Sequence, residues 1–173
     1  KANRLDEAEN DLMTIKVCNN KFYAIPVYNH TTGKLETARI DASRDIIIFA
    51  GLHSLYTKRL RELADIKVYV NTDDELRKFW KFRRDISERG KTLDSAQEDW
   101  SKRYIDSLKY IKPQLLYADV IINIFSENVD LKYFAENPKV YMEVDIKKEL
   151  IYKDDILHIL KNLNTKIEED EII

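Results

Sequence analysis

Three short, mostly apolar runs rich in β-branched residues constrain the fold of this chain most strongly. The runs cover residues 45–49, 66–70 and 119–124. Apolar runs of this length between polar residues are typical of strands that are buried on both faces. Segments with helical spacing lie after and between the runs, at about 54–64, 72–88 and 93–111. This order predicts an α/β fold, in which a parallel sheet carries helices on both faces in three layers.

Further elements are predicted toward the two ends of the chain. They are a helix at 4–15, an extended segment at 22–28, a strand at 140–146 and a helix at 154–163. Pro26 makes the segment at 22–28 an edge strand or a loop, because proline cannot donate to a strand ladder. Thr72 is followed three residues later by Glu75, which predicts a capping box at the start of the helix 72–88. The acidic end, at 168–171, is expected to fray.

Composition fits a single domain and excludes several classes of function. A length of 173 residues supports one domain with its own core, which we predict to span 1–173. The net charge of −2 gives no general attraction to nucleic acid or to an anionic membrane. No apolar run is long enough to cross a membrane. Cys18 is the single cysteine, so no intramolecular disulfide forms, which fits a cytoplasmic protein.

Glycine is scarce, and this excludes two nucleotide-binding loops from the chain. The sequence contains only Gly33, Gly51 and Gly90. A Walker A loop requires two glycines five residues apart, followed by lysine and serine or threonine. A Rossmann loop requires three glycines within six residues. Neither loop can be formed with these three positions.

The basic stretch 77–91 is the sharpest local signal for a binding site. Arg77, Lys81 and Arg84 are spaced to share one face of a helix, and Arg89 and Lys91 continue past its end. Arginine side chains match phosphate oxygens two at a time. The alternative is a solvated helix face on which acidic neighbours pair with the cations. The acids available for such pairing are Asp73, Asp74, Asp85 and Glu88.

A second candidate site follows the apolar run 45–49. Ala50 and Gly51 would let a ligand approach the backbone at the end of a strand, and His53 could act as a base or as a ligand group. The alternative for His53 is a partly buried histidine at the start of the next helix. The three histidines and one cysteine show no metal-ligand spacing. Asp73 and Asp74 lie in a first helical turn, where acids are favoured without any metal.

Several segments, in order, resemble the uridine kinase and phosphoribulokinase family. Residues 83–91, Arg-Arg-Asp-Ile-Ser-Glu-Arg-Gly-Lys, resemble the family pattern Lys-Arg-Asp-Ile-x-Glu-Arg-Gly-Arg. The other segments that carry the resemblance are 26–34, 47–53, 60–73 and 112–122. Together the segments cover residues from about 20 to 122. The resemblance implies a P-loop kinase fold without its N-terminal strand and phosphate-binding loop. It also implies ATP and Mg²⁺ as cofactors of the full-length protein.

The resemblance assigns roles to five residues. Arg84 and Arg89 match the family's lid arginines, which hold the ATP phosphates. Lys81 and Lys91 stand where the family has arginines near the nucleoside and the phosphates. Tyr28 matches a tyrosine that contacts the nucleoside. The reaction implied is transfer of the ATP γ-phosphoryl group to a nucleoside 5′-hydroxyl, by positioning and charge stabilisation.

The lid implied by the resemblance spans about residues 77–95. The tail, residues 125–173, resembles nothing in the family. We expect ATP and a nucleoside as partners, without nucleic acid or membrane. We also expect self-association, because loss of the first strand and P-loop helix would leave apolar sheet surface uncovered.

The sequence also departs from the family. The Walker A loop and the aspartate that activates the hydroxyl are expected upstream of Lys1, so we expect this chain alone to be inactive and to contain no catalytic residue. Ala50 replaces a glutamate that supports Mg²⁺, Gly33 replaces a histidine that reads the pyrimidine, and Asp99 replaces a glutamine.

These departures leave two alternatives beside a uridine or cytidine kinase. One is a degenerate module that binds nucleotide without catalysis, which Ala50 suggests. The other is a sugar-phosphate kinase like phosphoribulokinase, which the triplet of Gly51, Leu52 and His53 resembles.

Overall fold

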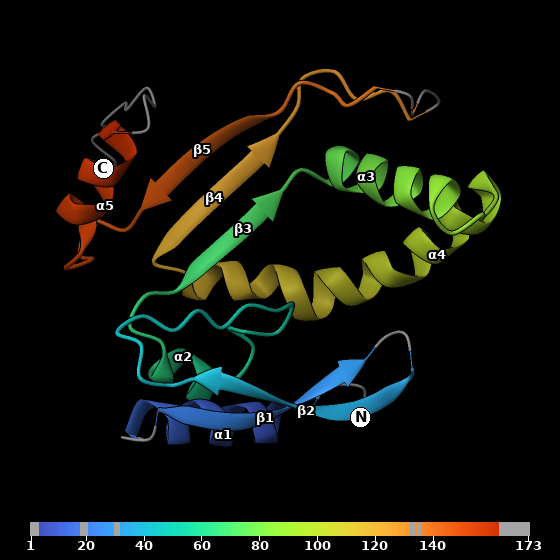
Figure 1. The fold of residues 1–173 in the computed structure, drawn as a ribbon. Coiled ribbons are helices and arrows are strands. Elements are labelled where there is room, and N and C mark those ends of the chain that lie inside the picture. The colour runs from blue at the N-terminus through green and yellow to red at the C-terminus, as the bar shows by residue number, and fades with distance from the viewer. Residues whose placement is uncertain (1–3, 18–20, 30–31, 132–133, 135, 163–173) are drawn as a thin grey trace. The chain divides into compact units, whose positions relative to one another are not determined.

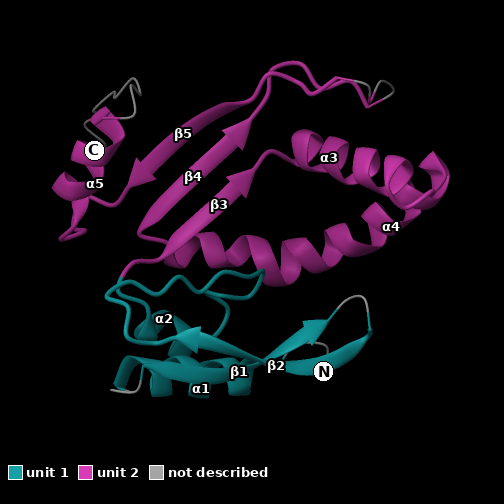
Figure 2. Ribbon diagram, in the orientation of Figure 1, with its two compact units in different colours: residues 1–65 teal, residues 66–173 magenta. Residues whose placement is uncertain are grey.

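The computed structural model divides into two compact units, residues 1–65 and 66–173 (Figure 2). It describes residues 4–17, 21–29, 32–131, 134 and 136–162 (Figure 1). The predicted frayed end at 168–171 lies outside these residues. A single domain over 1–173 stays a prediction. No helix among the described residues is long and apolar enough to cross a membrane.

Unit 1 combines two helices with a β-hairpin. The helices are α1 (Leu5–Val17) and α2 (Lys58–Leu63), and the strands are β1 (Phe22–Asn29) and β2 (Lys34–Asp41). The strands pair antiparallel, from Phe22 opposite Asp41 to Asn29 opposite Lys34. The turn contains Gly33 at a φ of 68°, in the left-handed region that favours glycine. The helix and extended segment predicted at this end are confirmed, and β2 is an addition that the sequence pattern did not predict.

The helices of unit 1 pack through a small buried cluster. Ile15 of α1 is buried, as are Leu55 and Leu60 around α2. Lys16 ties the end of α1 to the end of α2, because its ammonium group donates to the Leu63 carbonyl at 2.7 Å and lies 3.0 Å from the Asp65 carboxylate. These contacts fix the end of α1 against the chain that leaves α2.

The strand predicted at 45–49 is wrong. These residues form no strand, and Ile46 and Ile48 are 81% and 86% exposed. A strand needs a neighbour whose backbone groups complete its hydrogen bonds. Among the described residues of unit 1, β1 and β2 pair with each other and nothing pairs with 45–49. The helix predicted from Ser54 begins only at Lys58, because Thr57 caps it by accepting from the Leu60 amide.

Unit 2 contains the predicted α/β arrangement. Its sheet has the order β3 (Val68–Thr72), β4 (Val120–Phe125) and β5 (Tyr141–Ile146) (Figure 1). β3 and β4 are parallel and in register from Val68 opposite Val120, which confirms two predicted strands and the fold class. β5 is antiparallel to β4, so the sheet is mixed rather than wholly parallel. No crossover helix is found in the described part of the β4–β5 connection, and without one a chain returns antiparallel.

In the sequence of unit 2, a hairpin of two helices connects the parallel strands β3 and β4. α3 (Asp74–Ser87) follows β3, and α4 (Leu93–Asp106) returns toward β4 through a π-helical segment, η1 (Ser107–Ile111), and a 3₁₀ helix, η2 (Lys112–Tyr117). Leu76, Phe79 and Phe82 are buried at three-residue spacing on one face of α3. Trp100 of α4 meets Phe82 edge-on, with ring centres 6.5 Å apart. The last helix, α5 (Lys153–Asn162), follows β5.

Two predicted helix ends need correction. Asp73, not Thr72, caps α3, because its carboxylate accepts from the amides of Glu75 and Leu76 at 2.9 and 3.2 Å. The predicted capping box of Thr72 and Glu75 is therefore wrong. Helical structure also continues beyond Pro113, because this proline lies at the start of η2, where its missing amide breaks no hydrogen bond.

The cap assignment gives a direct test. Asp73→Ala removes both side-chain acceptors at the start of α3, so we expect the free energy of unfolding to fall by about 1 kcal/mol. Thr72→Ala, the matched control, should change it by less than about 0.5 kcal/mol. Urea denaturation of both variants provides the measurement. A larger loss for Thr72→Ala than for Asp73→Ala would contradict the assignment.

Candidate functional site

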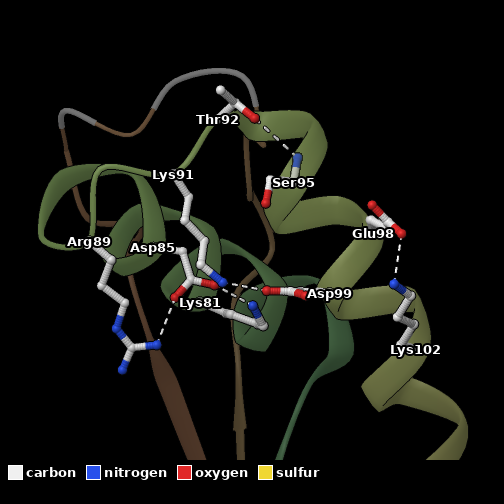
Figure 3. A network of polar contacts seen from close by, with 9 residues as sticks. All are labelled: Lys81, Asp85, Arg89, Lys91, Thr92, Ser95, Glu98, Asp99 and Lys102. Carbon is white, nitrogen blue, oxygen red and sulfur yellow. Dashed lines mark hydrogen bonds and ion pairs between the residues drawn. The ribbon is translucent and has the colours of Figure 1, made fainter.

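The basic stretch surrounds a buried carboxylate near the end of α3 (Figure 3). Asp85 has no exposed surface. Lys81, one turn earlier, contacts one oxygen of its carboxylate, and Arg89, one turn later, donates from Nη1 to the other oxygen at 3.0 Å. The spacing of four residues on each side of Asp85 puts both cations within reach of it. This arrangement fixes Lys81 and Arg89 around one anchor.

A second ion pair links the turn to α4. Gly90 has a φ of 64°, which allows the chain to reverse after α3. The Lys91 amide then donates to the Asp85 carbonyl at 3.0 Å, and the Lys91 ammonium group pairs with Asp99 of α4. Thr92 caps α4 by accepting from the Ser95 amide at 3.2 Å (Figure 3). The position of Lys91 is therefore set by both helices.

Both acids of this network stay ionised. Burial alone would raise the pKa of the Asp85 carboxyl, but the hydrogen bond from Lys81 and the charges of Lys81, Lys91 and Arg89 outweigh it and lower the pKa. The hydrogen bond from Lys91, together with its charge, lowers the pKa of Asp99. The network therefore combines two carboxylates with the cations Lys81, Arg89 and Lys91.

The cations retain donors that face solvent. Arg84 is exposed, and no hydrogen bond or ion pair of its guanidinium group is found within the described ranges. Arg89 is half exposed and uses one of its nitrogens on Asp85. An arginine carries five N–H donors in a fixed plane, so both residues can still bind oxygens of an anion. These donor groups fit a polyphosphate such as that of ATP.

Two of the four acids expected on a solvated helix face do pair with cations of the basic stretch, Asp74 with Arg77 and Asp85 with Lys81 and Arg89. Asp73 caps α3, and Asp74 contacts Arg77, Tyr104 and Lys112 near the start of that helix. Arg77 belongs to this second cluster, so it lies apart from the cations that the sequence grouped with it. Asp85 is the one acid of that set found to pair with Lys81 and Arg89 in the described structure.

Unit 1 contains an open cavity of about 850 Å³. Its lining includes Arg4, Tyr28, Gly33, Gly51, Leu52 and His53. Tyr28 is 52% exposed, so an aromatic face is accessible there. A Cβ added at Gly33 would lie 3.7 Å from the Tyr28 hydroxyl. The predicted residues Tyr28, Gly51 and His53 therefore line one cavity, while Ala50 is exposed next to it.

His53 is the polar group of the cavity that the sequence singled out. Its Nδ1 is buried without a hydrogen-bond partner among the described residues, and its ring meets Tyr56 edge-on with centres 5.6 Å apart. Burial of an unpaired ring nitrogen is costly, and a bound ligand could satisfy it. Arg4, which the sequence analysis did not select, adds a cation to the same lining.

The described residues hold no cluster of three or more histidine, cysteine or acidic side chains that could bind a metal ion. Within unit 2, the guanidinium donors left exposed on Arg84 and Arg89 suit an anion. Sequence reasoning found the cations and named Asp85 as a possible surface partner, but it did not predict that Asp85 is buried as their anchor. The signal was present, because Asp85 lies four residues from both Lys81 and Arg89.

The comparisons with known proteins agree on one family. A family model described as "Phosphoribulokinase / Uridine kinase family" matches residues 1–130. The chain is 36% identical over 124 residues to phosphoribulokinase of Synechocystis sp., which covers 72% of this chain and 37% of that protein. It is 43% identical over 105 residues to uridine kinase of Lactococcus lactis, which covers 57% of this chain and 48% of that protein. The chain thus spans less than half of these curated relatives.

A solved structure shares the fold. The phosphoribulokinase from Rhodobacter spheroides superimposes with a TM-score of 0.69 and 20% sequence identity, over 92% of this chain and 61% of that chain. A similarity at this level of identity supports the fold alone.

Replacement of the anchor tests the network. Asp85→Asn leaves the nearly buried ammonium group of Lys81 without its counter-charge, so we expect the free energy of unfolding to fall by about 3 kcal/mol at neutral pH. Glu98→Gln breaks the exposed pair of Glu98 with Lys102 and should cost less than about 0.5 kcal/mol. Urea denaturation measures both. Equal stability of Asp85→Asn and the unchanged chain would show that the network is not an anchor.

The same network predicts a pH dependence. The pKa of Asp85 in the folded protein lies below its ordinary value of 3.8, so the folded state binds the proton less readily than the unfolded state. Its stabilising contribution is therefore present above pH 3.8 and is lost as pH falls through the lower folded value. Thermal unfolding between pH 2 and 6 should show a shallower loss of stability for Asp85→Asn than for the unchanged chain.

Proposed function

The chain belongs to the phosphoribulokinase and uridine kinase family, whose members are kinases, and from that membership we propose that the complete protein transfers the γ-phosphoryl group of ATP to a hydroxyl group of a small sugar-containing acceptor. One observation supports the proposal in addition to family membership. Arg84 and Arg89 present unused guanidinium donors next to a buried, ionised anchor. Such a cluster is suited to hold phosphate oxygens.

In this proposal the α3–α4 hairpin acts as the lid over the phosphates. Arg84 and Arg89 bind phosphate oxygens, and Lys81 and Lys91 add charge beside them. The ion pairs with Asp85 and Asp99 hold three of these cations before any ligand arrives, so less side-chain freedom is lost on binding. Phosphoryl transfer depends mainly on such positioning and charge stabilisation. Closure of the lid would also exclude water from the reaction.

ATP with Mg²⁺ is the proposed phosphoryl donor of the complete protein. The described residues provide no carboxylate cluster for the ion, and Ala50 stands where the resemblance implies a supporting glutamate. We therefore assign no step to the metal. The residues described here contribute charge and orientation at the phosphates and, in unit 1, a cavity for the acceptor.

The first candidate acceptor is a nucleoside, with uridine or cytidine as the reference. Tyr28 exposes an aromatic face in the cavity, which suits contact with a base or sugar ring. Two features oppose selection of a pyrimidine. Gly33 lacks a side chain to read the base, and the Asp99 carboxylate, at the position of the family's glutamine, is bound to Lys91.

The second candidate acceptor is a sugar phosphate. Arg4 and His53 line the cavity of unit 1 together with the acids Glu7 and Asp11, and Arg4 is paired with Glu7. The remaining donors of Arg4 and the unpaired imidazole nitrogen of His53 can still contact a phosphate group. The phosphoribulokinase of Synechocystis sp. is also among the relatives. A non-catalytic nucleotide-binding module is the remaining alternative, because Ala50 removes the family's acidic group at that position.

An ADP-release assay on the complete protein tests the proposal. ATP and Mg²⁺ are combined in turn with uridine, cytidine, other nucleosides and ribulose 5-phosphate. We expect turnover with at least one acceptor, and the responding class decides between nucleoside and sugar phosphate. ATP binding without turnover of any acceptor would contradict the kinase proposal and favour the non-catalytic module.

Substitution of Ala50 separates an impaired kinase site from a degenerate one. Ala50→Glu restores the carboxylate that the resemblance implies, so we expect at least a tenfold rise in turnover at limiting Mg²⁺. Ala50→Gln is the matched control, since it has nearly the same size but no charge, and it should give no comparable rise. Equal rates for both variants and the unchanged protein would remove any role of position 50 in metal use.

A further inference from the structure

A second polar cluster lies at the end of α3 opposite to the lid cations. Its centre is Asp74, the first residue of that helix. Asp74 Oδ2 accepts hydrogen bonds from the Tyr104 hydroxyl at 2.9 Å and from the Lys112 ammonium group at 2.7 Å. Asp74 Oδ1 lies 2.9 Å from a guanidinium nitrogen of Arg77. One carboxylate on α3 is thus bound to α4 and to η2.

Arg77 makes the second connection between the two arms of the hairpin. Its Nη1 donates to the Ser107 hydroxyl at 3.2 Å, and its guanidinium group lies 5.1 Å from the ring centre of Trp100. Trp100 in turn stacks on Tyr104 with ring centres 5.8 Å apart. The side chain of Arg77 is therefore held by an ion pair, a hydrogen bond and an aromatic face, all at the same end of α3.

The contacts fall where the returning helix changes its geometry. α4 ends at Asp106, the π-helical segment begins at Ser107, and the 3₁₀ helix begins at Lys112. Ser107 and Lys112 are thus the first residues of two successive irregular segments. The Tyr69 hydroxyl donates to the Ile111 carbonyl at 3.4 Å, which ties the last π-helical residue to β3. Such interruptions of an α-helix often mark hinges.

The charges at this cluster are held in their ionised forms. Burial would raise the pKa of the Asp74 carboxyl, but the hydrogen bonds from Lys112 and Tyr104 and the charge of Arg77 outweigh it and lower the pKa. The hydrogen bond to Asp74 raises the pKa of Lys112. The link between α3 and η2 therefore remains an ion pair at neutral pH.

We propose that Asp74, Arg77, Tyr104, Ser107 and Lys112 form a pivot that sets the angle between α3 and α4, and that thereby positions the lid cations for phosphate. This inference rests on the proposed function. Since α3 has 14 residues, its far end lies about 20 Å from the pivot. A rotation of roughly 10° at the pivot would move Arg89 by about 3–4 Å, more than a hydrogen bond tolerates. The pivot residues are positioning residues, because they contact other parts of the hairpin rather than the ligand.

Two single variants and their combination test the pivot in the complete protein. Asp74→Asn and Lys112→Met each break the ion pair between α3 and η2. We expect each to raise the Kd of ATP about tenfold, and the double variant to be no worse than the single ones, because both remove the same link. Asp74→Glu keeps the charge and should recover part of the affinity. Lys102→Met, which breaks an exposed pair on α4, is the control and should leave the Kd unchanged.

A second readout distinguishes positioning from a general loss of structure. Amide hydrogen exchange is measured without ATP for the turn 88–92 and for the paired strands β3 and β4. We expect Asp74→Asn to speed exchange in the turn at least threefold while the strands stay protected. An unchanged Kd in both single variants, or faster exchange of strands and turn alike, would overturn the proposal.

Failure of the proposed function would be recognised separately. If the unchanged protein neither binds ATP nor turns over an acceptor, the kinase proposal fails. The exchange comparison then still tests the pivot, because it needs no ligand. Equal exchange of the turn in Asp74→Asn and in the unchanged protein would contradict the pivot in that case too.

Discussion

The buried carboxylate of Asp85 is the constraint on which the candidate phosphate site depends. A carboxylate without exposed surface is stable as an anion only when cations and hydrogen bonds replace the water around it. Lys81 and Arg89 meet this need from the turns before and after Asp85, and the charge of Lys91 adds to it. The acid therefore dictates where these cations lie. Without it, they would repel one another and disperse into solvent.

α3 connects this network to the pivot at its other end. Between Asp74 and Asp85, the buried face of Leu76, Phe79 and Phe82 packs against the core, so the helix transmits an orientation along its whole length. The two polar clusters differ in the hydrogen-bond donors that remain available to a ligand. The pivot uses the charge of Asp74 on Arg77 and Lys112, whereas the lid retains exposed guanidinium donors on Arg84 and Arg89. One end of the helix is thus suited to set an angle and the other to bind an anion.

Sequence reasoning succeeded where local pattern and tertiary structure agree. β3 and β4 were predicted because two apolar runs separated by helical segments indicate a parallel pair. The basic stretch was found because its cations recur at helical spacing within a short part of the chain. The segment 45–49 has an equally strong run, but no described strand pairs with it, and pairing is not encoded in the segment itself. β2 was missed because its mixture of charged and apolar residues lacks a buried face. The burial of Asp85 and the contacts of Arg77 with Ser107 and Trp100 were not predicted, because both depend on how α3 packs against the rest of unit 2.

The most direct test of this account is an equilibrium titration of the complete protein with ATP and with inorganic tripolyphosphate, measured by calorimetry. The tripolyphosphate isolates the contribution of the phosphate groups from that of the nucleoside. The account predicts binding of both ligands, and a weakening of at least tenfold for each arginine removed in Arg84→Ala and Arg89→Ala. Unchanged affinity for both ligands in the two variants would contradict the claim that these cations form the phosphate site.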